Sequence, residues 1–549
     1  MNFPRFPMIV PALDGHMAEI AGDFRRLSAT SVVDGVALSA SMRPTGNPPL
    51  AKSRRLAIAF RQLREALGHD APPSGILLQS TMGHGRADRD LPPFQRIVRS
   101  YGDEPAVFCP LDKDFVDFIA GEVAKLAAER PAFFILDDDT RLRTHRDACF
   151  CPLHLAEFSR RTGRDWRDRE SLIAALAADP SLAAAWEKLR LDTIARLARA
   201  VRGAFNAAAP SIPGAFCCCE ADVGDALAIA RLLAAAGQRP VIRINNGRYF
   251  HDGNRDLPTH LLRTEGQLLA LPPDSGAILL DEPDTCPHNR YSVSAANLHL
   301  HISLGLLSGL DGAKLWLTRM DSWEPASGEA YRRILKRNAG FYRELIRLAG
   351  GPPGASGAKS TGISWEGLRI PLSVPEAGAG PATPREGRDW GSSILGRMGI
   401  PYAYVRPEDA RGHAAEKLSA AFAEPLPEPG CCSIHELTVW FNETRKREIA
   451  AVLERLAMDE GDLPCWFTGD DEVMLRAGRA AGGDRILLVV PLSHDVLENI
   501  PLRFPFTPAA AMERLLPDGS WRPASFDSSS KVLRETVMPA DPAVFRHIP

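Results

Sequence analysis

The stretch AFFILDDDTRL, residues 132–142, runs from five apolar residues directly into three aspartates. Short apolar runs of this kind, rich in β-branched or aromatic residues, recur between amphipathic helical stretches, which is typical of a parallel sheet. The eight predicted strands are Met8–Leu13, Ser31–Leu38, Gly75–Ser80, Ala132–Leu136, Gly214–Cys219, Pro240–Asn245, Gly276–Leu280 and Gly312–Leu317.

Eight strands alternating with helices indicate an α/β fold in the form of a (β/α)8 TIM barrel, whose chemistry is expected at the C-terminal ends of the strands. Before the fourth strand, apolar residues at helical spacing form one packing face: Phe115, Ile119, Val123 and Leu126. An open doubly wound sheet is the alternative. It is less favoured because no glycine-rich phosphate-binding turn follows the first strand.

The chain of 549 residues is too long for one ordinary core. The segment GGPPGASGAKSTG, residues 350–362, is typical of a domain boundary. We therefore predict a barrel at 1–350, a mixed α/β domain at 360–478 and a small C-terminal β domain at 479–549.

Composition narrows the function classes. Apolar residues make up 45% and charged residues 24%, and the net charge is only -3 with no basic stripe, so nucleic acid is not an expected partner. The N-terminus has no signal-peptide pattern, and no apolar run approaches the roughly 18 residues that span a bilayer. We expect a cytoplasmic protein without a membrane segment. The ten cysteines do not form a disulfide framework.

Two acidic clusters follow predicted strands. Asp137, Asp138 and Asp139 follow the fourth strand, and Asp281, Glu282 and Asp284 follow the seventh. Both clusters are expected on the same barrel face, where two carboxyl groups can cleave a glycoside. The alternatives are a solvated acidic turn for the three aspartates and an ion pair of Glu282 with Arg243 or Arg319.

A possible metal group lies close to the fourth strand. Cys149, Cys151 and His154 fall within six residues, and Cys109 precedes the helix that leads into the strand. Four such ligands suit tetrahedral zinc in a closed, structural site. Reduced, packed cysteines are the equally weighted alternative.

Several polar or aromatic residues stand at or just past predicted strand ends and can contact a sugar. Trp323 offers a flat apolar face, and Glu220 is a rival acid/base candidate. Candidates for hydrogen bonds to hydroxyls are Asn245, Asn246, His84, Arg86 and Glu329.

The chain resembles the family 42 glycoside hydrolases of the β-galactosidase type. The resemblance rests on segments in the same order: FCPLDKDF, ILDDDTRL, CFCPLHLAEFSRRTG, ILLDEPD, GLDGAKLWLTRMDSWEPASGEAY, LGRMGIPYAY and LLPDGSWRPA.

This resemblance implies a barrel, then a flavodoxin/glutamine-amidotransferase-like domain that helps form homotrimers, and a small β domain. It implies Glu282 or, with a one-residue shift, Asp281 as nucleophile, and we favour Glu282 because its side chain reaches farther toward the sugar. It implies Asp139 as acid/base, one methylene shorter than the family's Glu. Asp138 stands where the family has Asn, and Glu329 corresponds to a sugar-binding Glu. It also implies structural Zn²⁺ on the Cys and His residues named above, without an organic cofactor.

The sequence therefore predicts a retaining glycosidase that acts on terminal β-linked sugars of a carbohydrate substrate, β-galactosidase- or β-mannosidase-like. Substrate contacts are expected from Arg86, Asp138, Asn245, Trp323 and Glu329. The alternatives are an inverting glycosidase that uses Asp139 and Glu282, a carbohydrate-binding protein that has lost catalysis, and a metallohydrolase that uses the Cys/His group.

Overall fold

The structure is a computed structural model. It describes residues 3–29, 32–83, 90–102, 104–142, 149–218, 223–247, 253–272, 274–286, 288, 292–350, 362–372, 395–406, 409, 444, 446–448, 451–452, 464–505 and 511–548. The candidates His84, Arg86 and Glu220 lie outside the described residues.

A closed parallel sheet forms the centre of residues 7–316, and all eight predicted strands are present. The sheet order is β8-β7-β6-β5-β4-β3-β2-β1-β9, and β9 pairs with β1, so the sheet closes into a barrel. The eighth predicted strand is divided at Lys314 into two short strands. The strands are β1 (Pro7–Pro11), β2 (Gly35–Ser41), β3 (Ser74–Gln79), β4 (Phe134–Leu136), β5 (Gly214–Cys217), β6 (Val241–Arg243), β7 (Ile278–Asp281), β8 (Gly312–Ala313) and β9 (Leu315–Trp316).

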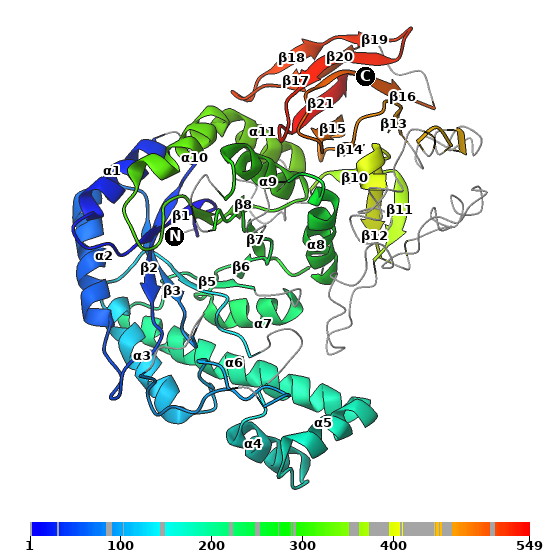
Figure 1. Cartoon of the computed structure of the whole chain (residues 1–549). Helices are drawn as coiled ribbons and strands as arrows, with labels where there is room; N and C mark the ends of the chain where they lie inside the picture. Colours follow the sequence, from blue (N-terminus) through cyan, green and yellow to red (C-terminus); the bar gives the residue numbers. More distant parts are fainter. Residues whose placement is uncertain are drawn as a thin grey trace.

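Helices surround this sheet (Figure 1). The helix predicted before the fourth strand is confirmed as α3, which buries the four predicted apolar residues. It begins at Lys113 because the Asp112 side chain accepts hydrogen bonds from the free backbone N–H groups of Asp114 and Phe115. The helices of this part are α1 (Met17–Ser28), α2 (Ser53–Leu67), α3 (Lys113–Ala127), α4 (Pro152–Thr162), α5 (Arg169–Ala178), α6 (Pro180–Ala208), α7 (Val223–Leu233), α8 (Leu257–Ala270), α9 (Ala295–Leu307), α10 (Pro325–Arg337) and α11 (Ala339–Gly350).

Apolar side chains fill the barrel interior, because alternation along each strand turns every second side chain inward. This interior cluster includes Ile9, Ala37, Leu77, Ile135, Ala215, Cys217, Val241, Leu280 and Trp316. Two positions further along β4, β6 and β7, the same alternation brings Asp137, Arg243 and Glu282 together. A layer of buried charges therefore lies directly beyond the apolar core, at the C-terminal ends of the strands.

The C-terminal part contains two antiparallel sheets packed on a shared apolar core. The six-stranded sheet has the order β10-β14-β15-β21-β17-β18, and the four-stranded sheet has the order β13-β16-β20-β19. The strands are β10 (Ser364–Glu366), β13 (Trp466–Phe467), β14 (Val473–Arg479), β15 (Arg485–Pro491), β16 (Leu497–Arg503), β17 (Ala511–Leu515), β18 (Trp521–Ala524), β19 (Phe526–Asp527), β20 (Val532–Val537) and β21 (Ala543–Ile548).

Of the segment 360–478, the described residues also include a short helix α12 (Gly396–Met398) and a parallel pair of strands, β11 (Leu368–Pro371) with β12 (Tyr402–Val405). Most of the remaining segment lies outside the described residues. The predicted amidotransferase-like domain and its boundaries therefore stay predictions.

Among the described residues, no helix is long and apolar enough to cross a membrane.

Candidate functional site

Arg243 joins the two acidic clusters at the C-terminal ends of the strands. Its Nη1 lies 2.6 Å from Oε2 of Glu282, which follows β7. Its Nη2 lies 2.9 Å from Oδ2 of Asp138 and 3.7 Å from Oδ1 of Asp137, which follow β4. Arg243 is only 2% exposed. The predicted meeting of the fourth-strand and seventh-strand carboxylates is therefore present in the structure, on one buried guanidinium.

Backbone N–H groups also hold the Glu282 carboxylate. The N–H of Asn246 donates to Oε2 at 3.0 Å, and the N–H of Gly247 donates to the same oxygen at 3.1 Å. Both groups belong to the segment after β6. With Arg243, three donors contact Oε2 of Glu282, and Glu282 is only 1% exposed.

A second buried cation, Lys314, completes the charged layer. It stands between β8 and β9, is 2% exposed, and places Nζ 3.6 Å from Oδ1 of Asp137. Burial opposes its charge, but Asp137 raises the pKa of Lys314 above its usual value, so it stays protonated. Lys314 is not among the site residues predicted from the sequence, where its only signal is a lysine inside an otherwise apolar strand.

The environment separates the pKa values of the carboxyl groups. Burial raises the pKa of Glu282 above its ordinary value, and Arg243 opposes this rise. Burial also raises the pKa of Asp137. For Asp138, burial is outweighed by Arg243, which lowers the pKa of that carboxyl. Carboxyl groups whose pKa values are pushed apart in this way are typical of acid/base sites.

Asp139, the predicted acid/base, has different surroundings from Asp138. Its Oδ2 accepts a hydrogen bond of 2.5 Å from the backbone N–H of Ser80, the residue after β3, and the side chain is 3% exposed. The structure therefore places Asp139 against the end of β3 and Asp138 on Arg243.

Besides Asp138, three predicted substrate contacts lie among the described residues, each in a different place. Two hydrogen bonds with the Gln267 side chain, of 3.1 and 2.9 Å, hold the backbone of Asn245 next to Glu282's backbone donors. Trp323 is partly buried, and its ring lies 6.3 Å from that of His16, beyond the end of β1. Glu329 lies on α10 with its side chain 53% exposed and pairs with Arg332 of the same helix.

Arg319, the other arginine considered as a partner of Glu282, pairs instead with Glu324 at 2.8 Å and Asp321 at 3.2 Å. The two histidines of α9 face different partners, as their spacing predicts. His299 bonds the hydroxyl of Tyr342 at 2.9 Å, whereas His301 lies 3.3 Å from Asp281.

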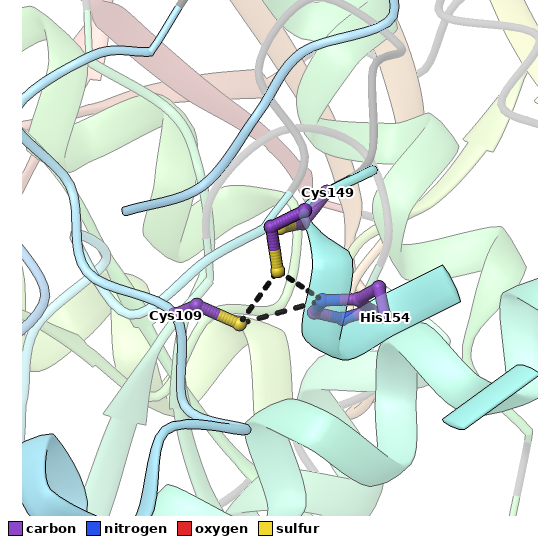
Figure 2. A group of neighbouring side chains, drawn as sticks. Cys109, Cys149 and His154 are labelled. Carbon is purple, nitrogen blue, oxygen red and sulfur yellow. Dashed lines mark hydrogen bonds between the residues drawn. The ribbon is translucent and has the colours of Figure 1, made fainter. Parts of the chain in front are cut away.

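The four predicted zinc ligands form one buried group that can hold a metal, with their ligand atoms within 4.8 Å of one another. Figure 2 shows Cys109, Cys149 and His154 pointing toward one another, from the segment before α3, the segment before α4, and α4 itself. The group therefore ties α4 to the chain that leads into α3.

The distances within this group fit a tetrahedral zinc site. Sγ of Cys109 lies 3.7 Å from Sγ of Cys151, and these two sulfur atoms lie 3.3 and 3.4 Å from Nδ1 of His154. Zinc bonds of about 2.3 Å to sulfur and 2.0–2.1 Å to nitrogen place tetrahedral ligands roughly 3.5–3.8 Å apart. The other ring nitrogen of His154 lies 3.4 Å from the hydroxyl of Thr193, the kind of second contact that orients a ligating histidine.

Comparison with known proteins supports the fold. No protein-family model matches the chain, and no curated protein matches it either. A β-galactosidase from Rahnella sp. R3 has a similar structure over 100% of this chain and 99% of that chain, with a TM-score of 0.54 and 9% sequence identity. The catalytic domain of a β-amylase from Paenibacillus polymyxa matches 60% of this chain and 97% of its own, with a TM-score of 0.38 and 10% identity. Of these two, only the β-galactosidase has a TM-score above 0.5, and at 9% sequence identity its similarity to this chain concerns the fold alone.

Proposed function

We propose that the chain is a glycoside hydrolase that cleaves terminal β-linked sugars, with Glu282 as the nucleophile of a retaining mechanism. The observation that carries the proposal is the convergence of carboxylates from β4 and β7 on Arg243 at the active-site face of the barrel. The shared fold of the β-galactosidase from Rahnella sp. R3 supports it.

In the first step, a carboxylate oxygen of Glu282 attacks the anomeric carbon while Asp139 protonates the departing glycosidic oxygen. Oε2 is held by Arg243 and by the N–H groups of Asn246 and Gly247, so Oε1 is the oxygen that attacks. In the second step, Asp139 removes a proton from water, which displaces Glu282 from the sugar. The free sugar leaves, and both carboxyl groups return to their starting states.

Asp139 is the proposed acid/base, and Asp138 has a separate role. Because Arg243 lowers the pKa of Asp138, that carboxyl stays ionised and is poorly suited to donate a proton. An ionised Asp138 beside the nucleophile can instead accept a hydrogen bond from a sugar hydroxyl. The other proposed substrate contacts are Arg86, Asn245, Trp323 and Glu329.

The test compares four isosteric variants, Glu282→Gln, Asp139→Asn, Asp138→Asn and Glu366→Gln, on nitrophenyl β-glycosides. Glu282→Gln should lose turnover and fail to recover with azide, because no glycosyl-enzyme forms for azide to release and the Gln side chain fills the space from which azide could attack the sugar directly. Asp139→Asn should lose about 10²–10⁴-fold in turnover and recover with azide, which needs no general base. Glu366→Gln, on β10, is the matched control and should behave as the parent protein.

Full activity of Glu282→Gln would contradict the nucleophile assignment. Azide recovery in Asp138→Asn with none in Asp139→Asn would move the acid/base role to Asp138. Parent protein without turnover on galactosides, mannosides and other β-glycosides, but with sugar binding, would favour a carbohydrate-binding protein that has lost catalysis.

An inverting mechanism with Asp139 and Glu282 is the second candidate, favoured by the shorter side chain of Asp139. A wider gap between the carboxyl groups leaves room for a water, and this gap is about 6.5–9.5 Å in inverting enzymes. Proton NMR of the first product formed distinguishes the two. The β-anomer supports retention, and the α-anomer supports inversion.

We further propose that Cys109, Cys149, Cys151 and His154 hold a structural Zn²⁺. Four protein ligands fill a tetrahedron, which favours bracing of α4 over a metallohydrolase reaction. Metal analysis should find about one zinc per chain, and Cys109→Ser should lose the zinc and stability together. None of the seven cysteines in the described part forms a disulfide bond, which suits the proposed cytoplasmic location.

A homotrimer formed with the help of the segment 360–478 is a separate proposal that rests on the family resemblance. Light scattering of the purified protein should give a mass three times that of the chain, and a monomer mass would overturn it.

A further inference from the structure

A second set of polar side chains lies behind Glu282, on the side of β7 that faces the helices. Oδ1 of Asp281 accepts hydrogen bonds from the Asn246 side chain at 2.7 Å and from the backbone N–H of Glu282 at 2.8 Å. Asn246 also donates its own backbone N–H to Oε2 of Glu282. The three residues therefore form a closed ring of hydrogen bonds, which holds Glu282 by both its backbone and its carboxylate.

Two helices hold this ring in place. The hydroxyl of Thr264, on α8, donates to the Asn246 side-chain oxygen at 2.8 Å. Nε2 of His301, on α9, lies 3.3 Å from Oδ1 of Asp281. The ring of His260 packs edge-on against the His301 ring, with 4.3 Å between the ring centroids. All of these side chains are 5% exposed or less.

Helix α9 approaches the ring closely at Gly305. A Cβ atom at this position would overlap Oδ2 of Asp281, so only glycine lets the helix pack directly on the carboxyl group. Asn246 and Asp281 therefore contact each other and buried side chains of α8 and α9. These contacts lie on the helix-facing side of β7, apart from the apolar cluster that fills the barrel interior.

We infer that Asn246 and Asp281 are positioning residues that fix the direction in which the Glu282 carboxylate faces the substrate. The inference rests on the proposed function, because it gives Asn246 and Asp281 a purpose only if Glu282 is the nucleophile. With Oε2 anchored, the other oxygen keeps one orientation between turnovers. A displacement of about 1 Å at a reacting group can cost on the order of 10²-fold in rate.

The test measures kcat and KM for Asn246→Ala and Asp281→Ala on a nitrophenyl β-glycoside that the parent protein hydrolyses. We expect kcat to fall by about 10²-fold in each, with KM changed by less than about threefold, because the sugar-binding side chains are untouched. Ser303→Ala is the matched control. It removes a buried hydrogen bond of 2.7 Å to the backbone of His299 on the same helix, away from the ring, and should leave kcat unchanged.

The exchanged pair, Asn246→Asp with Asp281→Asn, separates positioning from a general loss of packing. Asn at 281 can still accept from the Glu282 N–H and donate to Asp at 246, so the ring is restored with its polarity reversed. We expect the double variant to recover at least tenfold over Asn246→Asp alone, in which two carboxylates face each other without a donor between them.

Single variants with parental kcat, or an exchanged pair no better than Asn246→Asp alone, would overturn the inference. If Glu282→Gln retains turnover, the proposed function fails; if Glu282→Gln is inactive while Asn246→Ala is fully active, only the positioning role fails. Circular dichroism melts confirm that each variant is folded.

Discussion

The guanidinium of Arg243 uses both of its Nη atoms, one on Glu282 and one on Asp138. Lysine offers a single point charge and cannot reproduce this fork. We expect Arg243→Lys to fold and to lose activity on nitrophenyl glycosides. Arg243→Met should also lose about 3–5 kcal/mol in the free energy of unfolding, because it leaves buried carboxylates without their cation.

The matched control for this pair is Arg347→Lys on α11, whose partner Glu344 lies 2.7 Å away and whose side chain is 43% exposed. An exposed pair contributes about 0–1 kcal/mol. Denaturant unfolding and steady-state kinetics provide the comparison. Parental activity in Arg243→Lys would show that the fork has no role in turnover.

Burial of Glu282 predicts the pH dependence of the reaction. Since burial raises its pKa, with Arg243 in opposition, the group ionises at higher pH than an ordinary glutamate, whose pKa is about 4.3. The nucleophile must be ionised, so kcat/KM falls as the pH falls through this raised pKa.

The neighbouring charge of Asp284 contributes to the raised pKa of Glu282. Asp284→Asn should therefore move the acidic limb of the kcat/KM profile to lower pH. A limb that stays in place, or moves to higher pH, contradicts the assignment of that limb to Glu282.

The sequence is sufficient to locate the strand ends, but it predicts only some of the contacts among the side chains at those ends. The sequence places Glu282 and Arg243 at strand ends and allows an ion pair between them as the alternative to catalysis. Lys314 was missed because its partner, Asp137, lies 177 positions earlier in the chain and a lone lysine in a strand predicts no partner. The different surroundings of Asp138 and Asp139 depend on the turn after β4, where strand alternation no longer applies.

At the level of helix α9, His299 links stability to pH. Burial, with Arg337 nearby, lowers its pKa to about 3 from the usual value of 6.5. The folded state therefore holds His299 neutral. The free energy of unfolding therefore keeps its full value above the pKa that this histidine has in the unfolded chain. It falls by about 2 kcal/mol between pH 7 and pH 5, because the unfolded chain then binds a proton that the folded protein does not.

Denaturant unfolding at both pH values tests this contribution. The difference between the two free energies of unfolding should be about 2 kcal/mol smaller in His299→Gln than in the parent protein. An equal difference in the two proteins would show that His299 accepts a proton in the folded state at pH 5.

The strands were predictable because apolar runs alternate with helical segments, and each run is buried in the closed sheet. The division of the eighth strand was not. Lys314 interrupts it, and its neighbours pair with different strands, Ala313 with β7 and Leu315 with β1. This switch closes the barrel and depends on geometry that periodicity does not contain.

Across the whole molecule, Arg476 connects the C-terminal sheet to the barrel. It lies on β14, is 1% exposed, and pairs with Glu265 of α8 at 3.0 Å. Its guanidinium lies 4.6 Å from the ring of Trp365 and 4.7 Å from that of Tyr402. The arginine thus brings together β10, β12, β14 and a barrel helix.

Arg476→Met should cost about 3–5 kcal/mol of stability, because the buried Glu265 loses its partner. Arg479→Met is the control on the same strand. The Arg479 side chain is 46% exposed, so its ion pair with Glu366 should contribute about 1 kcal/mol or less to stability. Thermal unfolding of both variants measures the difference. Equal losses would show that Arg476 is no special link.

The sequence predicted a β-rich C-terminus from its turns and short strands, but not where its sheet begins. Strand β10, at Ser364–Glu366, pairs with β14 more than a hundred positions later. Such long-range pairing leaves no local pattern. The described sheet therefore includes strands from both sides of the predicted division at residues 478 and 479.

Attack of Glu282 on the anomeric carbon can be tested by trapping the covalent glycosyl-enzyme. A 2-fluoro glycoside of the preferred sugar should inactivate the protein, and mass spectrometry of its peptides should find one fluoro-sugar on Glu282. A label on any other residue, or no label on a protein that hydrolyses the parent glycoside, would contradict the account.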